Sequence, residues 1–260
     1  ILDLITLTAE PGVIGGVPAG GLNFGAAINT QAIVDQPSQF DFYDGGGLDI
    51  AFLGLAQADR EGNLNVSKFG PKLAGAGGFI NISQSAKKVV FVGTFTAGQL
   101  EIAISPDGLH ILADGKANKF VGAVEHRTFS GPVAAATGKT VLYITERCVF
   151  RLGAEGLELI EIAPGVDLQR DILDRMEFVP IMKRPPALMD QRLFSDEAMG
   201  LRPGLLEMPL EQRLAYDSEQ NVFFVNFEGL SVRSNADIDR IREAVESRLA
   251  PIGHKVAAIV

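Results

Sequence analysis

Residues 87–94 read KKVVFVGT, and this short stretch points to the fold class of the whole chain. Its apolar centre is continuous rather than alternating, which is typical of a strand buried on both faces in a parallel sheet. Working outward, similar apolar runs bounded by turn residues predict further strands at Ile1–Thr8, Asp49–Leu55, Thr140–Thr145, Cys148–Leu152, Leu157–Ile162, Asn221–Phe227 and Lys255–Val260.

Two stretches between these runs predict helices. Asp167 is a good N-cap residue and precedes an apolar-periodic stretch at Leu168–Met176. Ser234 and Asp237 have the spacing of a capping box, and the helix that they open continues to about Leu249. Short apolar strands with helical stretches between them predict an α/β protein.

Prolines gather between Pro180 and Met208, which predicts a meandering connection. We therefore expect one domain at residues 1–180 and a C-terminal strand–helix–strand extension at residues 181–260, packed on the same half. Both ends of the chain lie in apolar β-type runs, so we expect a fragment or one half of a longer polypeptide.

The composition argues against several classes of protein. The chain has 23 basic and 32 acidic residues, a net charge of −9, which argues against a nucleic-acid surface. No run of 18 uncharged apolar residues occurs, so we expect no membrane span. The single cysteine, Cys148, excludes an internal disulfide framework; with three scattered histidines, it also argues against a metal site. One cysteine and no signal-peptide pattern predict a cytoplasmic protein.

Glu10 is the first candidate for chemistry. It follows a predicted strand at a sharp turn, and no Lys or Arg occurs before Arg60. A carboxylate in such surroundings is a possible covalent nucleophile, because strand ends beside loops are where α/β proteins place ligands. The alternative is a solvated turn residue, and position alone leaves both open.

The cluster Gly75-Ala76-Gly77-Gly78 is the second candidate. Successive backbone N–H groups of such a loop can bind an anion or a developing oxyanion, although a tight turn explains the glycines equally well. The cluster fits neither a P-loop nor a dinucleotide fingerprint. Nearby Lys68, Lys72, Lys87 and Lys88 either attract phosphates or are solvated. Cys148 lies in an apolar run and is interpreted as a core residue.

Four motifs, the last of them a strand pair in two segments, together resemble the β-type half of the family I coenzyme A transferases. They occur in the family's order over about residues 1–180: Thr8–Gly16 (TAEPGVIGG), Gly46–Asp49 with Leu53–Asp59, Gly62–Asn65 with Gly75–Phe79, and Ile144–Phe150 with Gly156–Glu161. The longer C-terminal part is similar to single-chain acetate or propionate CoA-transferases. The N-terminal, α-type half of such enzymes has no counterpart here, so the resemblance implies a partner half in the same polypeptide or in a complex.

The resemblance implies a three-layer α/β/α fold with a mostly parallel or mixed sheet. It also implies ping-pong transfer of CoA between a short-chain acyl-CoA and a carboxylate such as acetate, through a glutamyl-CoA thioester on Glu10. Backbone N–H groups of Gly77, Gly78 and Phe79 are expected as oxyanion donors. The residues expected to bind CoA or substrate are Gly15, Gly16, Gln57, Asn65, Gly75 and Ala76.

Coenzyme A is expected as a substrate, with no permanently bound cofactor and no metal, in a homo-oligomeric enzyme. Two alternatives stay open at this point. One is an acyl-CoA hydrolase on the same scaffold, in which water resolves the intermediate. The other is a noncatalytic half that binds CoA or a sugar phosphate.

Overall fold

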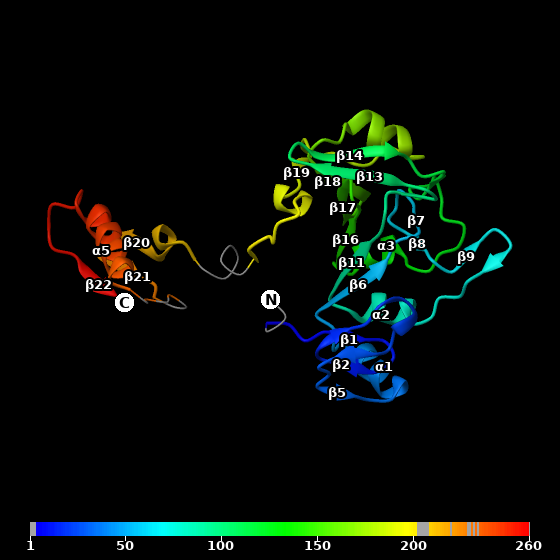
Figure 1. Ribbon diagram of the computed structural model, residues 1–260, viewed down its shortest axis with the longest axis horizontal. Coiled ribbons are helices and arrows are strands. Elements are labelled where there is room, and N and C mark those ends of the chain that lie inside the picture. Colours follow the sequence, from blue (N-terminus) through cyan, green and yellow to red (C-terminus); the bar gives the residue numbers. More distant parts are fainter. Residues whose placement is uncertain are drawn as a thin grey trace. The chain divides into compact units, whose positions relative to one another are not determined.

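The computed structural model describes residues 4–201, 208–218, 220–227, 230, 232 and 234–259. The chain forms two compact units, one of residues 2–198 and one made up essentially of residues 199–260 (Figure 1).

A six-stranded mixed sheet is the centre of the first unit. Its strands, in spatial order, are β19 (Ala187–Leu188), β18 (Gly156–Ile162), β17 (Cys148–Gly153), β16 (Thr140–Ile144), β11 (Lys88–Val92) and β6 (Ile50–Gly54). The run at residues 87–94 does form a central strand, because β11 pairs in parallel with both β6 and β16. β17 is antiparallel to β16 and β18, and β19 is parallel to β18. The predicted α/β class with a mixed sheet is confirmed.

Smaller antiparallel sheets surround the central one. They are β1 (Thr8–Ala9), β2 (Val13–Ile14) and β5 (Ala32–Ile33); β3 (Val17–Pro18) with β4 (Ala27–Ile28); β7 (Gln57–Ala58) with β8 (Leu64–Asn65); β9 (Lys68–Phe69) with β10 (Lys72–Leu73); β12 (Thr96–Ala97) with β15 (Ala117–Asn118); and β13 (Glu101–Ser105) with β14 (Gly108–Ala113). The helices and helical turns are α1 (Gln36–Asp44), α2 (Phe79–Ser85), α3 (Gly131–Ala136), η1 (Gly21–Asn23), η2 (Leu168–Ile172), η3 (Leu173–Arg175) and η4 (Gln191–Phe194).

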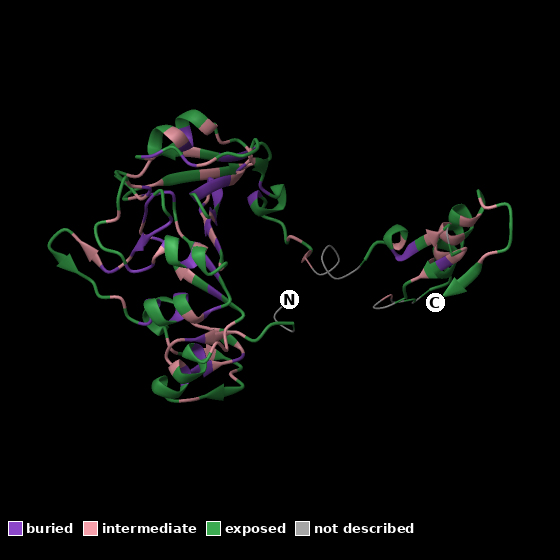
Figure 2. Ribbon diagram, turned by 180° about the vertical axis from the view of Figure 1, so that it is seen from behind, coloured by how far each residue is buried: buried purple, intermediate pink, exposed green. Residues whose placement is uncertain are grey.

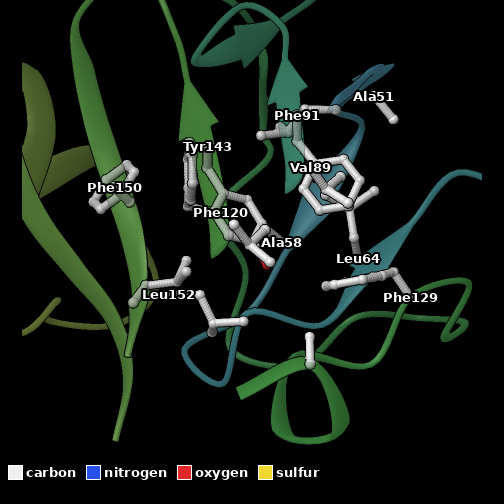
Figure 3. Packing of buried hydrophobic residues seen from close by; sticks show 14 of the residues in the cluster. Ala51, Ala58, Leu64, Val89, Phe91, Phe120, Phe129, Tyr143, Phe150 and Leu152 are labelled. Atoms are coloured by element: carbon white, nitrogen blue, oxygen red, sulfur yellow. The ribbon is translucent and has the colours of Figure 1, made fainter. Parts of the chain in front are cut away.

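An aromatic core covers one face of the central sheet, and the close view in Figure 3 shows part of it. Phe91 of β11 lies at its centre: its ring centroid is 5.0 Å from that of Phe129 and 5.1 Å from that of Tyr143. Phe91 also stacks on Phe79, the first residue of α2, at 5.6 Å. The core therefore fixes the start of α2 and, with it, the glycine loop that precedes this helix.

On the opposite face, the β13–β14 hairpin and η4 cover the part of the sheet around β17 and β18, whereas Phe52 of β6 and Val92 of β11 are exposed. Leu109 of β14, Met189 and Phe194 pack there in one buried cluster with Val149 of β17. This third layer consists of a hairpin and short helical turns rather than long helices. Figure 2 shows how the buried residues concentrate in the strands between the two outer layers.

The boundary between the units lies after Ala198, later than the predicted boundary after Pro180. Residues just beyond Pro180 belong to the first unit because they complete its sheet. The N–H of Leu159 donates to the carbonyl of Ile181 at 2.8 Å, and β19 pairs with β18. Met189 is buried in the second cluster.

The second unit contains η5 (Leu210–Arg213), β20 (Leu214–Asp217), β21 (Val222–Val225), α5 (Asn235–Leu249) and β22 (Ala257–Ile259). β21 and β22 pair in parallel around α5, so the predicted strand–helix–strand order is confirmed, and β20 adds an antiparallel strand. The capping box is also present, because Ser234 and Asp237 each accept a hydrogen bond from the other's backbone N–H. The expected packing of this unit on the first one stays a prediction.

Two predicted elements differ from the structure. In the expected strand Ile1–Thr8, residues 1–3 lie outside the described part, and only Thr8 pairs within a sheet. Asp167 does cap the stretch at Leu168–Met176, since its carboxylate accepts a hydrogen bond from the N–H of Arg170 at 2.7 Å. That stretch forms a π-helical turn and a 3₁₀ turn rather than an α-helix.

Candidate active site

Glu10 lies on a tight β-hairpin. β1 and β2 pair antiparallel, with Ala9 opposite Val13, so Glu10, Pro11 and Gly12 form the connection. The N–H of Gly12 closes the turn on the carbonyl of Ala9 at 3.0 Å. Gly12 has a φ of +118°, and a Cβ there would collide with the carbonyl oxygen of Val34. Only glycine suits this position, and its backbone directs the hairpin that carries Glu10.

The carboxylate of Glu10 lies against the glycine loop. A Cβ added to Gly78 would be 2.8 Å from Cδ of Glu10 and 2.9 Å from Oε2, closer than real Cβ contacts allow. A Cβ on Gly77, which has a φ of +53°, would be 4.0 Å from Oε1. The fold therefore brings together two motifs that are far apart in the sequence. Among the described residues, no ion pair or hydrogen bond engages this carboxylate.

The backbone donors of the loop are not all available. Gly75 donates its N–H to the carbonyl of Ser67 at 3.1 Å, and Phe79 donates its N–H to the carbonyl of Ala76 at 3.1 Å. The N–H groups of Gly77 and Gly78 have no acceptor within the described part of the chain. Of the three donors that we predicted, Phe79 is therefore already engaged, and Gly77 and Gly78 remain.

Gly15 and Gly16 shape the turn after β2. Both have positive φ, +75° and +69°. A Cβ on Gly15 would be 2.6 Å from the side chain of Gln31, and one on Gly16 would collide with the backbone of Ile28. These contacts explain both glycines without a ligand, so their predicted contact with substrate stays a prediction.

Gln57 and Asn65 bind each other rather than Glu10. Nδ2 of Asn65 donates to Oε1 of Gln57 at 2.6 Å and to the carbonyl of Lys68 at 2.7 Å. Its Oδ1 accepts from the N–H groups of Ser67 and Lys68. The side-chain amide of buried Asn65 is therefore engaged within the protein, and its predicted contact with CoA or substrate stays a prediction. Asn65 supports Ser67, whose carbonyl holds the start of the glycine loop.

The lysines near the loop do not form one cationic group. Lys68 lies 3.9 Å from a carboxylate oxygen of Glu125, whereas Lys87 pairs with Asp49 at 2.7 Å. Lys72 is exposed on β10. This arrangement favours the interpretation of these lysines as solvated surface residues.

Arg147, within one of the resemblance motifs, is fully buried in an ionic cluster. Its guanidinium contacts carboxylates of both Asp114 and Glu146, and it lies 5.0 Å from the ring centroid of Phe95. Burial opposes ionisation of Asp114, but hydrogen bonds from Arg147 and Thr96 and the charge of Arg147 hold its pKa below the ordinary value. The cluster joins β12 and the end of β14 to the β16–β17 turn and has a structural role.

Cys148 is confirmed as a core residue. It is fully buried, its sulfur lies 3.6 Å from Oγ1 of Thr145, and burial raises the pKa of its thiol. The described parts contain no group of three or more His, Cys, Asp or Glu side chains suited to a metal ion. Nor is any described helix long and apolar enough to cross a bilayer.

Helix α1 was missed by the sequence interpretation, although its side chains contact the Glu10 hairpin and the glycine loop. Phe40 lies so close to Gly78 that a Cβ there would be 2.5 Å from its ring, and Gln39 and Tyr43 bond to the Glu10 hairpin. Its available signals were Pro37 in the first turn and the four-residue spacing of Gln39 and Tyr43.

No family model matches the chain. It is 52% identical over 198 residues to acetate CoA-transferase YdiF of Escherichia coli (strain K12), covering 76% of this chain and 37% of that protein. It is 51% identical over 205 residues to caffeate CoA-transferase of Acetobacterium woodii, covering 77% and 39%. The crystal structure of the E. coli O157:H7 acyl-CoA transferase YdiF, a thioester complex with CoA, matches with a TM-score of 0.71 and 51% identity over 76% of this chain and 37% of that one.

The chain thus spans well under half the length of the curated relatives that it matches. The matched relatives are CoA-transferases at about half identity, and the fold agrees with a solved member. The chain therefore belongs to the family I coenzyme A transferases.

Proposed function

We propose that Glu10 is the nucleophile of a CoA-transferase that moves CoA between a short-chain acyl-CoA and a free carboxylate such as acetate. The observation that carries the proposal is the position of the Glu10 carboxylate on Gly78, beside the unengaged N–H groups of Gly77 and Gly78. A nucleophile and its oxyanion donors must meet at one point in space for acyl transfer.

The proposed reaction conserves atoms and charge without an added acid. A Glu10 oxygen bonds to the thioester carbonyl carbon; the C–S bond breaks, and CoA leaves as a thiolate. The thiolate then attacks Cδ of Glu10 in the resulting anhydride, and the first carboxylate leaves. A second carboxylate attacks the glutamyl-CoA thioester and the steps run in reverse.

The surroundings of Glu10 favour its role as a nucleophile. No residue from Pro11 to Val34 is charged, and within the described part no cation pairs with the carboxylate. Weak solvation of the anion raises its reactivity toward a carbonyl carbon. The N–H groups of Gly77 and Gly78 are proposed to stabilise the oxyanion of each tetrahedral intermediate; loss of one such donor typically costs about 10²–10³-fold in rate.

We also propose that a second polypeptide segment, an α-type half, completes the site. The hairpin region that follows Glu10 exposes Leu22, Phe24, Ile28 and Ile33, with Leu22 fully exposed. Apolar residues gathered on one uncharged segment mark a surface that another protein surface covers. CoA acts as a substrate in this proposal, in a cytoplasmic homo-oligomer with no resident cofactor or metal.

The test uses the natural protein that contains this chain. After incubation with acetyl-CoA, mass spectrometry is expected to find CoA on the peptide that carries Glu10, and hydroxylamine is expected to remove it. Glu10→Gln is expected to lose the adduct and the activity, whereas the matched control Glu101→Gln, on exposed β13, keeps both. An active Glu10→Gln protein with no adduct in the parent would refute the proposal.

One further measurement separates transfer from hydrolysis. If the enzyme is a transferase, consumption of propionyl-CoA depends on added acetate and yields acetyl-CoA. A rate that is independent of acetate, with free CoA as product, would instead support the hydrolase alternative. Binding of CoA without any turnover would support the noncatalytic alternative.

A further inference from the structure

Helix α1 directs two buried polar side chains at the hairpin that carries Glu10. Gln39 and Tyr43 are only 1% and 2% exposed and lie one helical turn apart, on the same face of α1. Buried polar groups on a short helix need hydrogen-bond partners. Theirs are residues on either side of Glu10.

Gln39 contacts both strands of the hairpin. Its Nε2 lies 3.3 Å from the carbonyl oxygen of Ala9 and 3.4 Å from that of Val13, so one amide reaches the residue on each side of the Glu10–Gly12 connection. The same Nε2 lies 2.8 Å from Oη of Tyr43. Tyr43 in turn donates its hydroxyl hydrogen to Oγ1 of Thr8 at 2.9 Å.

The same helix also contacts the glycine loop. The ring of Phe40 packs on Gly78, which in turn contacts the Glu10 carboxylate. Asp44, at the end of α1, accepts hydrogen bonds from Nδ2 of Asn81 in α2 at 3.0 and 3.1 Å. Helix α1 therefore links the nucleophile's hairpin to the loop that offers the oxyanion donors.

Burying the side chain of Gln39 carries a free-energy cost. Its Oε1 is buried and has no hydrogen-bond partner among the described residues. A buried acceptor without a partner destabilises a protein, and an apolar side chain of similar size avoids that cost. We attribute the amide at this position to its donor atom, Nε2, which contacts both strands of the hairpin.

We propose that Gln39 and Tyr43 are positioning residues that set the orientation of Glu10 relative to Gly77 and Gly78. This inference rests on the proposed function of Glu10. Neither side chain touches the reacting atoms; each acts through the backbone or side chain of residues 8, 9 and 13. A misplacement of about 1 Å in a catalytic group is enough to cost about 100-fold in rate.

The experiment measures kcat, KM and glutamyl-CoA formation in the natural protein that contains this chain. Tyr43→Phe, Thr8→Val and Gln39→Met are expected to lower kcat and the rate of adduct formation by about 10- to 100-fold, with KM for acyl-CoA changed less than about 3-fold. The matched controls are Gln36→Met, exposed on the same helix, and Tyr216→Phe, whose hydroxyl binds Asn221 in the other unit. Both controls are expected to match the parent.

A double-mutant cycle tests the connection itself. If Tyr43 acts through Thr8, the Tyr43→Phe/Thr8→Val protein is no slower than the slower single variant. Thr8→Val also keeps the test decisive if Gln39→Met fails to fold, because Thr8 is only partly buried. Folding is followed by thermal unfolding, and rates are compared per folded molecule.

The outcomes separate this inference from the function on which it rests. A parent protein without an adduct refutes the proposed function. A parent with the adduct, and Tyr43→Phe and Thr8→Val proteins that form it at the parental rate, refutes the positioning role and leaves the function standing. Additive effects of the two substitutions also refute the proposed connection.

Discussion

The carboxylate of Glu10 lies directly on the backbone of Gly78, in the space that a side chain on residue 78 would need. This contact joins the hairpin at the start of the chain to the loop before α2. Its geometry leads to predictions about the site, and the buried ionic cluster leads to predictions about stability.

Gly78→Ala is expected to reduce activity by about 10²–10³-fold. The new methyl group would lie 2.8 Å from Cδ of Glu10 and 2.5 Å from the ring of Phe40, so one of them must move. Steady-state kinetics and the rate of adduct formation measure the effect. Gly54→Ala is the matched control, because nothing lies within 4 Å of its new Cβ. Equal activity of the two variants would contradict the contact.

Gly12→Ala is expected to destabilise the Glu10 hairpin and remove activity. At a φ of +118° the alanine is strained, and its Cβ collides with the carbonyl of Val34. Gly138→Ala separates the two effects, since its φ is +69° but its Cβ meets nothing within 4 Å. We expect the control to lose about 1 kcal/mol of unfolding free energy and keep its activity. Thermal or urea unfolding measures the first quantity.

Arg147→Met is expected to lower the free energy of unfolding by about 3 kcal/mol, because it removes the ion-pair partner of Glu146 and leaves the largely buried carboxylate of Asp114 with Arg175 alone. Arg242→Met, which removes an exposed pair with Asp239 on α5, is expected to cost less than about 0.5 kcal/mol. Urea unfolding measures both. Similar losses in the two variants would show that the cluster is not structural.

Stability is expected to fall on acidification, in part through Asp114. Its pKa in the folded protein is lower than the ordinary value of 3.8, so the folded state holds the ionised form more strongly than the unfolded state does. This contribution is present above about pH 4 and is lost as the pH falls through the folded-state pKa. The melting temperature of Asp114→Asn should therefore depend less on pH below about 4 than that of the parent. Parallel curves would contradict this.

Cys148 is expected to resist alkylation in the folded protein. Burial raises the pKa of its thiol, and the thiolate is the reactive species. Labelling by iodoacetamide at pH 8 should therefore be slow until the protein is unfolded in urea, when it becomes rapid. Mass spectrometry of timed samples follows the reaction. Rapid labelling of the native protein would show that the strand pair around Cys148 opens readily.

Local sequence patterns predicted much of the fold. The continuous apolar run at residues 87–94, the hairpin at residues 148–162 and the capping box at Ser234 all formed as expected. Each of these depends on neighbours along the chain, through strand pairing across a short turn or a side chain bonded to its own helix. Helix α1 was not predicted, because its nine residues of mixed polarity show almost no helical periodicity of apolar side chains.

The sequence by itself determined the α/β class and five of the six strands of the central sheet, β19 excepted, because these follow from local conformational preference and the burial of apolar runs. Only the tertiary structure decided that Glu10 contacts Gly78 and that the N–H of Phe79 is already hydrogen-bonded. It also decided that the side chain of Asn65 bonds to neighbouring protein groups. Those outcomes depend on how distant segments pack. The hydrogen-bond partner of a buried polar atom is known only when the fold has positioned both groups.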